Sequence, residues 1–291
     1  MLEEEIYVHR QGAMGDIIMT LPCLPELKKR SKKLKYYTSK GTKDQLENLL
    51  LNFVDEVVST EVEMAPWGHK NFINFLGYKK PYPLPRNDHF TKDFSEEAGV
   101  DFTLELPELP LPPSPFNDKD VNITIQRSAG WSVYKEYNQW DEVIRLCKKA
   151  QLNYKFFQIG GPHDNLLKNI DESFLGKSFD ENLAAQANAA LHLGVDSVFN
   201  HASNLRWCNK GKTRSIIIFS STSPLTSGYL YNTNLKSNLN CQPCYRENPE
   251  AGDGSLAPTN KCPFLKEEVA PCIDKITPTL IVENIKLLLN V

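Results

Sequence analysis

The pattern of apolar and polar positions alternates between strand-sized and helix-sized segments in the first part of the chain. Short apolar runs predict strands at 6–10, 34–38 and 54–58. Apolar positions at helical spacing predict helices at 17–30 and 42–51. Because strands that alternate with helices are typical of a parallel sheet, we expect a Rossmann-like domain here.

Prolines interrupt this pattern. Eight of the 19 prolines fall between Pro81 and Pro115, and five of these lie between Pro107 and Pro115. Such a stretch favours extended, semi-rigid backbone and is a poor place for a core, so we expect an interdomain linker at 107–119. The alternative is a long surface loop within one domain. From Trp67 to Phe94, aromatic residues and prolines follow no clear period.

The alternation returns after the predicted linker and indicates a second Rossmann-like domain. The predicted segments are strands at 121–126, 156–159, 191–195 and 214–219, and helices at 137–150, 164–170, 181–190 and 278–289. We therefore expect an α/β protein with two Rossmann-like domains that face each other across a cleft. Its polar loops lie at the carboxyl ends of the strands, where open α/β sheets bind ligands. The expected units are residues 1–106, the linker at 107–119, a second domain at 120–276 with a cysteine-containing segment at 241–272, and a C-terminal helix at 277–291.

Charge and hydropathy narrow the function classes. The 33 Lys+Arg and 36 Asp+Glu residues give a formal charge of −3, which excludes a strongly basic nucleic-acid coat. No apolar run approaches the roughly 18–20 residues that cross a bilayer. The acidic N-terminus does not resemble a signal peptide, so a cytoplasmic location is expected. An odd count of seven cysteines argues against a disulfide framework.

A glycine loop follows the first predicted strand. Gly12 and Gly15 allow the backbone to approach a ligand closely, and Asp16 then lies near the start of a helix, facing the cleft. The alternative, which spacing alone favours, is that Asp16 caps the helix. The loop lacks both the dinucleotide-binding signature and the Lys-Ser/Thr of a P-loop.

Two further loops follow strands of the second domain. Ser128 lies in a small-residue loop ahead of Lys135, and hydroxyls, backbone N–H groups and an ammonium together suit a diphosphate. The alternative for Lys135 is an exposed loop lysine. Asp196 and Ser197 suit a phosphate or ribose, or a helix cap, and His201 shares a helix face with Ser197. A single histidine of this kind is more often structural than catalytic.

The C-terminal region carries four cysteines at spacings that partly match a metal site. Cys241 and Cys244 have the spacing of a metal knuckle, whereas Cys262 and Cys272 are farther apart than a zinc ribbon requires. Four thiolates on one Zn or Fe ion would make this polar segment rigid. Free or disulfide-bonded cysteines are the alternative.

The order of these motifs resembles glycosyltransferase family 9, the ADP-heptose:lipopolysaccharide heptosyltransferase family. The resemblance covers about the first 30 residues and nearly everything from Val121 onward. It rests on Gly12-Ala-Met-Gly-Asp-Ile-Ile-Met-Thr-Leu-Pro22, Ser128-Ala129-Gly130 through Lys135-Glu-Tyr-Asn-Gln-Trp140, Gln158-Ile-Gly-Gly-Pro-His-Asp164, Gly194-Val-Asp-Ser-Val-Phe-Asn-His-Ala202, Phe219-Ser-Ser-Thr-Ser-Pro224 with Gly228-Tyr229, and the cysteines from Cys241 to Cys272. The chain departs from the family pattern at Val198, where the family has Gly, and at Ser220-Ser221, where it has Gly-Pro or a close variant.

The resemblance implies a GT-B fold and inverting transfer from a nucleotide-diphosphate sugar, with no metal or other cofactor needed for catalysis. Asp16 would be the general base or substrate-orienting carboxylate, and Gly15 would bind the acceptor. The residues carried over to the donor site are Ser128 and Lys135 for the diphosphate, with Asp196, Ser197, His201 and Thr222 lining the site.

The expected reaction transfers a sugar, with ADP-heptose as the favoured donor, to lipopolysaccharide or another surface glycan. Two alternatives stay open: a protein or modified-DNA acceptor, and a degenerate member that binds nucleotide-sugar without turnover. DNA would be a partner only as an acceptor. The cations from Lys28 to Lys35 would suit an anionic acceptor or a peripheral membrane contact, or else they form a solvated helix end.

Overall fold

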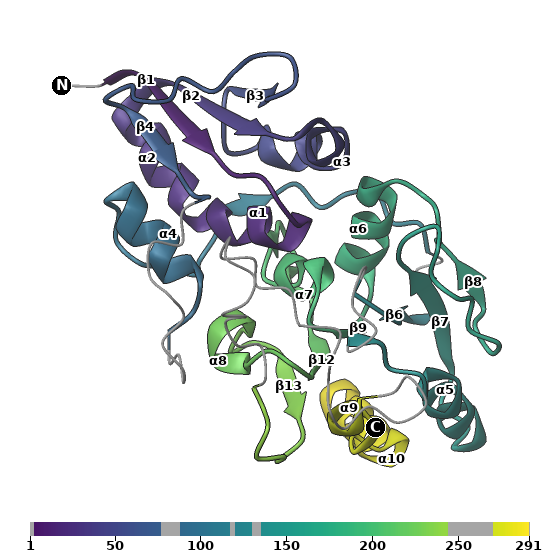
Figure 1. The fold of residues 1–291 in the computed structure, drawn as a ribbon. Coiled ribbons are helices and arrows are strands. Elements are labelled where there is room, and N and C mark those ends of the chain that lie inside the picture. The colour runs from purple at the N-terminus through teal and green to yellow at the C-terminus, as the bar shows by residue number, and fades with distance from the viewer. Residues whose placement is uncertain (1–2, 77–87, 117–119, 130–134, 244–269, 291) are drawn as a thin grey trace.

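The computed structural model describes residues 3–76, 88–116, 120–129, 135–243 and 270–290. Figure 1 shows two α/β lobes, one above the other, each built on a parallel sheet. The first lobe has the strand order β3-β2-β1-β4. Its strands are β1 (Glu3–His9), β2 (Ser31–Thr38), β3 (Glu56–Ser59) and β4 (Phe72–Asn74), and its helices are α1 (Met14–Thr20), α2 (Leu24–Arg30), α3 (Lys40–Leu50) and α4 (Thr91–Ala98).

The predicted strands and helices of this lobe are confirmed, with shifted ends. The predicted helix at 17–30 is divided into α1, a 3₁₀ turn at Leu21–Cys23 and α2, with Pro22 and Pro25 each in the first turn of its own segment. This agrees with the chemistry of proline, which lacks an N–H and fits only the start of a helix. β4 and α4 were not predicted: β4 lies in the stretch from Trp67 to Phe94 that has no clear period, and α4 begins in it.

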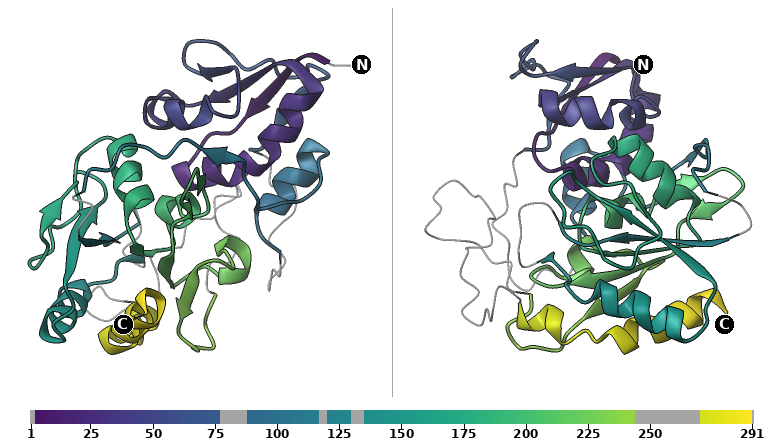
Figure 2. Two further views of the ribbon diagram at one scale, coloured as in Figure 1. Left: turned by 180° about the vertical axis from the view of Figure 1, so that it is seen from behind. Right: turned by 90° about the vertical axis from the view of Figure 1, so that its right-hand side faces the viewer.

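The second lobe is a six-stranded parallel sheet of order β13-β12-β9-β6-β7-β8. Its strands are β6 (Val121–Gln126), β7 (Tyr154–Ile159), β8 (Glu172–Ser173), β9 (Leu191–Val195), β12 (Ser215–Phe219) and β13 (Thr233–Lys236). Its helices are α5 (Trp140–Lys149), α6 (Phe179–Asn188), α7 (Val198–Ala202), α8 (Pro224–Ser227), α9 (Pro271–Asp274) and α10 (Pro278–Leu289). Figure 2 shows α5 and α10 side by side on the face of this sheet that points away from the first lobe.

One predicted helix is wrong. Residues 164–170 form a bend and irregular backbone with a turn at 168–169, because side chains bind backbone groups that a helix would use. Asp164 Oδ2 accepts the N–H of Gly161, and Gln158 binds the backbone of Asn165 and Leu167. Local side-chain bonds of this kind compete with helix formation.

The predicted linker stays a prediction, but part of it is ordered against the second lobe. β5 (Glu108–Leu109) joins a small sheet with β10 (Arg206–Trp207) and β11 (Gly211–Lys212). Asn188 donates to the carbonyl of Pro112 at 3.0 Å. The chain therefore reaches the second sheet along a fixed path.

The two lobes share one hydrophobic core. It joins α1 and α2 of the first lobe to Phe179, Phe199 and Leu205 of the second. α1 packs on α7, and α3 packs on α6. The carboxyl ends of β1 and β9 are thereby brought to the same region, which positions the polar residues that follow each strand.

We predict that His192 makes folding stability depend on pH. This β9 side chain is fully buried, Nδ1 lies 3.1 Å from Thr124 Oγ1, and burial lowers its pKa to about 3. Between pH 3 and its ordinary value near 6.5, the unfolded chain binds the proton more readily, so stability falls as pH falls through this range.

The free energy of unfolding should lose up to about 1.4 kcal/mol per pH unit from this group. Urea unfolding at several pH values measures it. His192→Leu should flatten the slope, and the same change at the exposed His163 is the control. An unchanged slope in His192→Leu would contradict the assignment.

Candidate active site at the contact between the lobes

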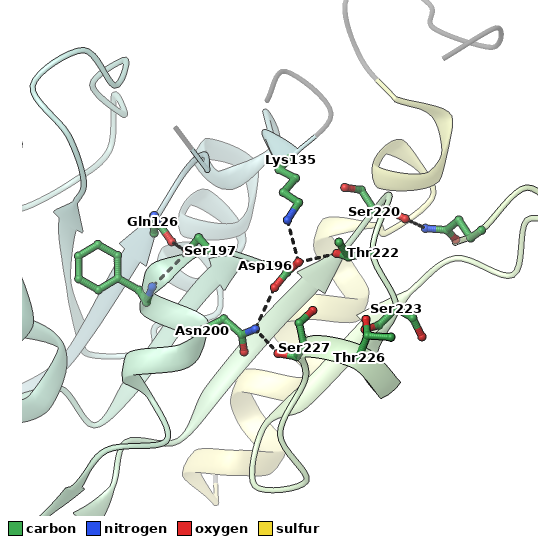
Figure 3. A network of polar contacts seen from close by, with 12 residues as sticks. Gln126, Lys135, Asp196, Ser197, Asn200, Ser220, Thr222, Ser223, Thr226 and Ser227 are labelled. Atoms are coloured by element: carbon green, nitrogen blue, oxygen red, sulfur yellow. Dashed lines mark hydrogen bonds and ion pairs between the residues drawn. The ribbon is translucent and has the colours of Figure 1, made fainter. Parts of the chain in front are cut away.

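Asp196 is the centre of a buried polar network. It follows β9, and its backbone N–H donates to the carbonyl of Ile218 at 3.1 Å. Lys135 Nζ lies 2.8 Å from Asp196 Oδ2, and Thr222 Oγ1 donates to the same oxygen at 2.5 Å. Asn200 Nδ2 donates to Oδ1 at 3.0 Å. Figure 3 shows these side chains converging on the carboxylate from three separate segments.

The ion pair decides the charge state of this network. Burial by itself raises the pKa of Asp196, but Lys135, His201 and the hydrogen bonds more than offset it and hold that pKa below its usual value. The carboxylate is therefore ionised at neutral pH. Because Lys135 balances its charge, the buried pair is neutral as a unit.

His201 lies beside this pair on α7. Burial lowers its pKa, although Asp196 and Asp16 act in the opposite direction. Nδ1 lies 3.0 Å from the hydroxyl of Tyr229. Burial and Asp196 raise the pKa of Tyr229, so that hydroxyl keeps its proton and donates a hydrogen bond to Nδ1. We assign the neutral tautomer with the proton on Nε2, the nitrogen that faces α1.

Asp16 stands on the first-lobe side of the contact. Its N-cap interpretation is wrong, because the N-cap of α1 is Ala13 and Asp16 lies inside the first turn. Arg10 Nη2 lies 2.6 Å from Asp16 Oδ2, and Arg10 Nη1 donates to the carbonyl of Phe75 at 3.2 Å. The Arg10 side chain is 6% exposed and that of Asp16 is 33% exposed. A substrate can therefore reach the exposed part of the Asp16 carboxylate, while the buried Arg10 binds Oδ2.

Gly15 makes the close approach of the lobes possible. A Cβ at this position would lie 2.8 Å from His201 Cδ2 and 3.3 Å from Nε2. Both Asp16 and Asp196 act electrostatically on the same imidazole. The structure thus places a first-lobe carboxylate and the Lys135–Asp196 pair around one histidine.

Two of the predicted donor-site residues have other partners. Ser128 donates to Asp164 and so joins its loop to the Gly160–Asp164 turn rather than to Lys135. Ser197 donates to Gln126, and its oxygen accepts the N–H of Phe199 at 3.2 Å as the N-cap of α7. The structure therefore brings together Gly15, Asp16, Lys135, Asp196, His201 and Thr222, with Ser197 alongside, whereas the hydroxyl of Ser128 is bound to Asp164.

Sequence reasoning missed three contributors. Arg10 had a weak signal, since a cation directly precedes the glycine loop. Asn200 lies four residues after Asp196, a spacing that puts both on one helical face. Tyr229 entered only through the family motif, and its bond to His201 spans 28 residues.

The predicted cysteine site lies partly outside the described residues. Cys241 is half-buried and Cys272 is buried, whereas Cys244 and Cys262 fall outside the described ranges. Within those ranges no three His, Cys, Asp or Glu side chains are grouped as metal ligands would be.

The cationic run is largely neutralised by neighbouring carboxylates. The pairs are Lys28 with Asp55, Lys29 and Arg30 with Glu26, Lys32 with Glu4, and Lys33 and Lys35 with Glu56. This pairing favours a solvated surface over an anionic partner. The helix-end interpretation holds only as far as Arg30, because Lys32, Lys33 and Lys35 lie on β2. Among the described helices, none is both long and apolar enough to cross a membrane.

Comparison of whole structures places the fold among known transferases. The iron-containing dodecameric glycosyltransferase TibC from enterotoxigenic E. coli H10407 aligns with a TM-score of 0.70 and 16% identity, over 99% of this chain and 77% of that one. The fold is that of the family 9 glycosyltransferases. The family 9 enzyme from Veillonella parvula DSM 2008 gives a TM-score of 0.68 at 14% identity, and the ADP-heptose lps heptosyltransferase II of E. coli gives 0.66 at 11%. These two alignments cover 99% and 98% of this chain, and 98% of each of those chains.

This result confirms the predicted GT-B architecture. TibC has also been crystallised in complex with ADP-D-β-D-heptose. No family model matches the sequence, and no curated protein matches it either. The likeness is therefore one of fold, and the chemistry must be argued from the site.

We predict that Gly15→Ala forces α1 away from α7. The new methyl group would meet the buried His201 ring, which Tyr229 holds in place, so stability should fall by about 1–3 kcal/mol. Chemical denaturation measures the loss.

Gly41→Ala is the matched control. Gly41 lies in α3, and a Cβ added there would have no other atom within 4 Å, so alanine should stabilise by about 0.5–1 kcal/mol. Equal effects of the two variants would contradict the close contact.

Proposed function

We propose that the protein transfers a sugar from a nucleotide-diphosphate donor to a hydroxyl acceptor with inversion at the anomeric carbon. The observation that carries this is the placement of Asp16 opposite the buried Lys135–Asp196 pair, with His201 between them. A transferase of this kind needs a carboxylate on the acceptor side and a cation on the leaving-group side.

These positions support the following reaction. Asp16 accepts the proton of the acceptor hydroxyl, whose oxygen attacks the anomeric carbon from the face opposite the diphosphate. The bond between that carbon and the diphosphate oxygen breaks, and the electron pair leaves with the diphosphate. Arg10 fixes one oxygen of Asp16 and leaves the exposed part of the carboxyl group for the substrate.

Lys135 would stabilise the leaving diphosphate. It now pairs with Asp196, which keeps hydrogen bonds from Thr222 and Asn200 when the ammonium is shared with a phosphate. Charge-assisted bonds of this type are the strong ones in phosphate recognition. Ser128 would add a hydroxyl at the far end of the diphosphate.

The favoured donor is ADP-heptose and the favoured acceptor a surface glycan such as lipopolysaccharide. The donor is supported by the shared fold with TibC, whose complex contains ADP-D-β-D-heptose. The acceptor rests on the family resemblance. The alternatives are a protein or modified-DNA acceptor and a non-catalytic nucleotide-sugar binder, and the following experiment separates the binder from the enzymes.

Two variants test the proposal. Asp16→Asn keeps the shape of the side chain but cannot take a proton, so turnover should fall by about 10²- to 10⁴-fold while donor affinity stays the same. Lys135→Ala should weaken ADP binding by about 1–3 kcal/mol. Calorimetry with ADP measures the affinity, and a transfer assay with ADP-heptose measures the turnover. Lys149→Ala, on the exposed end of α5, is the control.

The results distinguish the hypotheses. If wild type and Asp16→Asn bind nucleotide but are equally inert in transfer and hydrolysis, the protein is a binder rather than an enzyme. If Lys135→Ala binds ADP as tightly as wild type does, Lys135 is not a diphosphate ligand.

We also propose that Cys241, Cys244, Cys262 and Cys272 hold one structural Zn or Fe ion. The support is the Cys-x2-Cys spacing of Cys241 and Cys244 and the donor chemistry, because cysteine sulfur is a ligand that suits both metals. Elemental analysis should find about one equivalent of metal, retained in Cys208→Ser and lost in Cys241→Ser. Less than about a tenth of an equivalent in the wild-type protein would contradict the site.

A further inference from the structure

Three serine hydroxyls next to the Asp196 network have no hydrogen-bond partner in the described part of the chain. They belong to Ser220, Ser221 and Ser227, which are 1%, 2% and 3% exposed. Buried hydroxyls are nearly always satisfied in folded proteins, so three orphans within eight residues need an explanation.

The backbone of two of these serines is already in use. The carbonyl of Ser220 accepts from Gln242 Nε2 at 2.6 Å, and that of Ser227 accepts from Asn200 Nδ2 at 2.7 Å. Figure 3 shows Ser220 and Ser227 on either side of Thr222, within the group of polar side chains around Asp196. Backbone hydrogen bonds therefore fix the positions of Ser220 and Ser227, while their side-chain hydroxyls make no hydrogen bond within the described residues.

The charge of the network selects what can satisfy them. Asp196 is ionised, and in the proposed complex its partner Lys135 is already shared with the diphosphate, so a carboxylate on the sugar would meet repulsion that no further cation of this described network offsets. A sugar hydroxyl has no such conflict, because it can donate to the carboxylate or to a serine oxygen and accept from a serine O–H.

We infer that Ser220 and Ser227, with Thr222 and Asn200, form the subsite for the hydroxyl groups of the transferred sugar, and that this subsite selects a neutral polyhydroxylated sugar over an acidic one. The inference rests on the proposed function and adds the part of the donor that these residues recognise. Ser220 stands where the family pattern has Gly, so that pattern does not provide its hydroxyl.

Ser220→Ala, Ser227→Ala and the double variant test the subsite. Calorimetry with ADP and with ADP-D-β-D-heptose separates the nucleotide from the sugar. Each single variant should weaken ADP-heptose binding about three- to tenfold, and the double variant should weaken it more, while ADP affinity stays within about twofold of wild type.

The ligand-free protein provides a second readout. Removing a buried hydroxyl that has no partner should leave Tm unchanged or raise it. Ser31→Ala is the matched control, because its buried hydroxyl donates to the carbonyl of Leu27 at 3.2 Å in the first lobe. That variant should lower Tm and leave both affinities unchanged.

Three outcomes would overturn the inference. They are an equal loss of ADP and ADP-heptose affinity, no loss of either, and a lower Tm with unchanged affinities, which would make the hydroxyls structural. If wild type binds neither ligand, the proposed function itself fails, and the subsite with it. If wild type binds ADP-heptose more tightly than ADP, and the variants bind ADP-heptose as tightly as wild type does, only the sugar subsite is wrong.

Discussion

The buried ion pair between Lys135 and Asp196 is the interaction on which the rest of the site depends. A carboxylate this deeply buried is stable only with a cation and several hydrogen-bond donors. The donors come from α7 and from the loop after β12, and the cation comes from the segment that follows β6. Three segments of the second lobe must therefore be correctly placed before the site exists at all.

The contact between α1 and α7 connects this pair to the first lobe. Gly15 lets the helices approach, His201 fills the space between them, and Tyr229 fixes its orientation through Nδ1. Residues 88–98 support the same junction, because Phe90 donates to the carbonyl of Thr226 and Thr91 donates to that of Met19. The second lobe thus controls the surroundings of a carboxylate that belongs to the first.

Local sequence patterns sufficed for the features that depend on few neighbours. The strands β6 and β9 were predicted from local pattern alone, since each carries apolar residues at alternate positions. Asp16 and Asp196 were found because each lies shortly after the end of a predicted strand. The helix at 164–170 failed because Gln158, a side chain on another segment, competes for its backbone. The roles of Arg10 and Tyr229 depend on partners that only the folded chain brings together, and no spacing in the sequence reveals them.

The pairing of Arg10 with Asp16 has a consequence for how the lobes can move. Each lobe carries its own compensated carboxylate: Arg10 neutralises Asp16 in the first, and Lys135 neutralises Asp196 in the second. Separating the lobes breaks neither ion pair, so neither Asp16 nor Asp196 becomes an unpaired charge on the exposed surface. Opening the enclosure for a bulky substrate therefore leaves both ion pairs intact, and it gives up apolar contacts between α1 and α7 together with hydrogen bonds such as the one from Asn48 to Asp180.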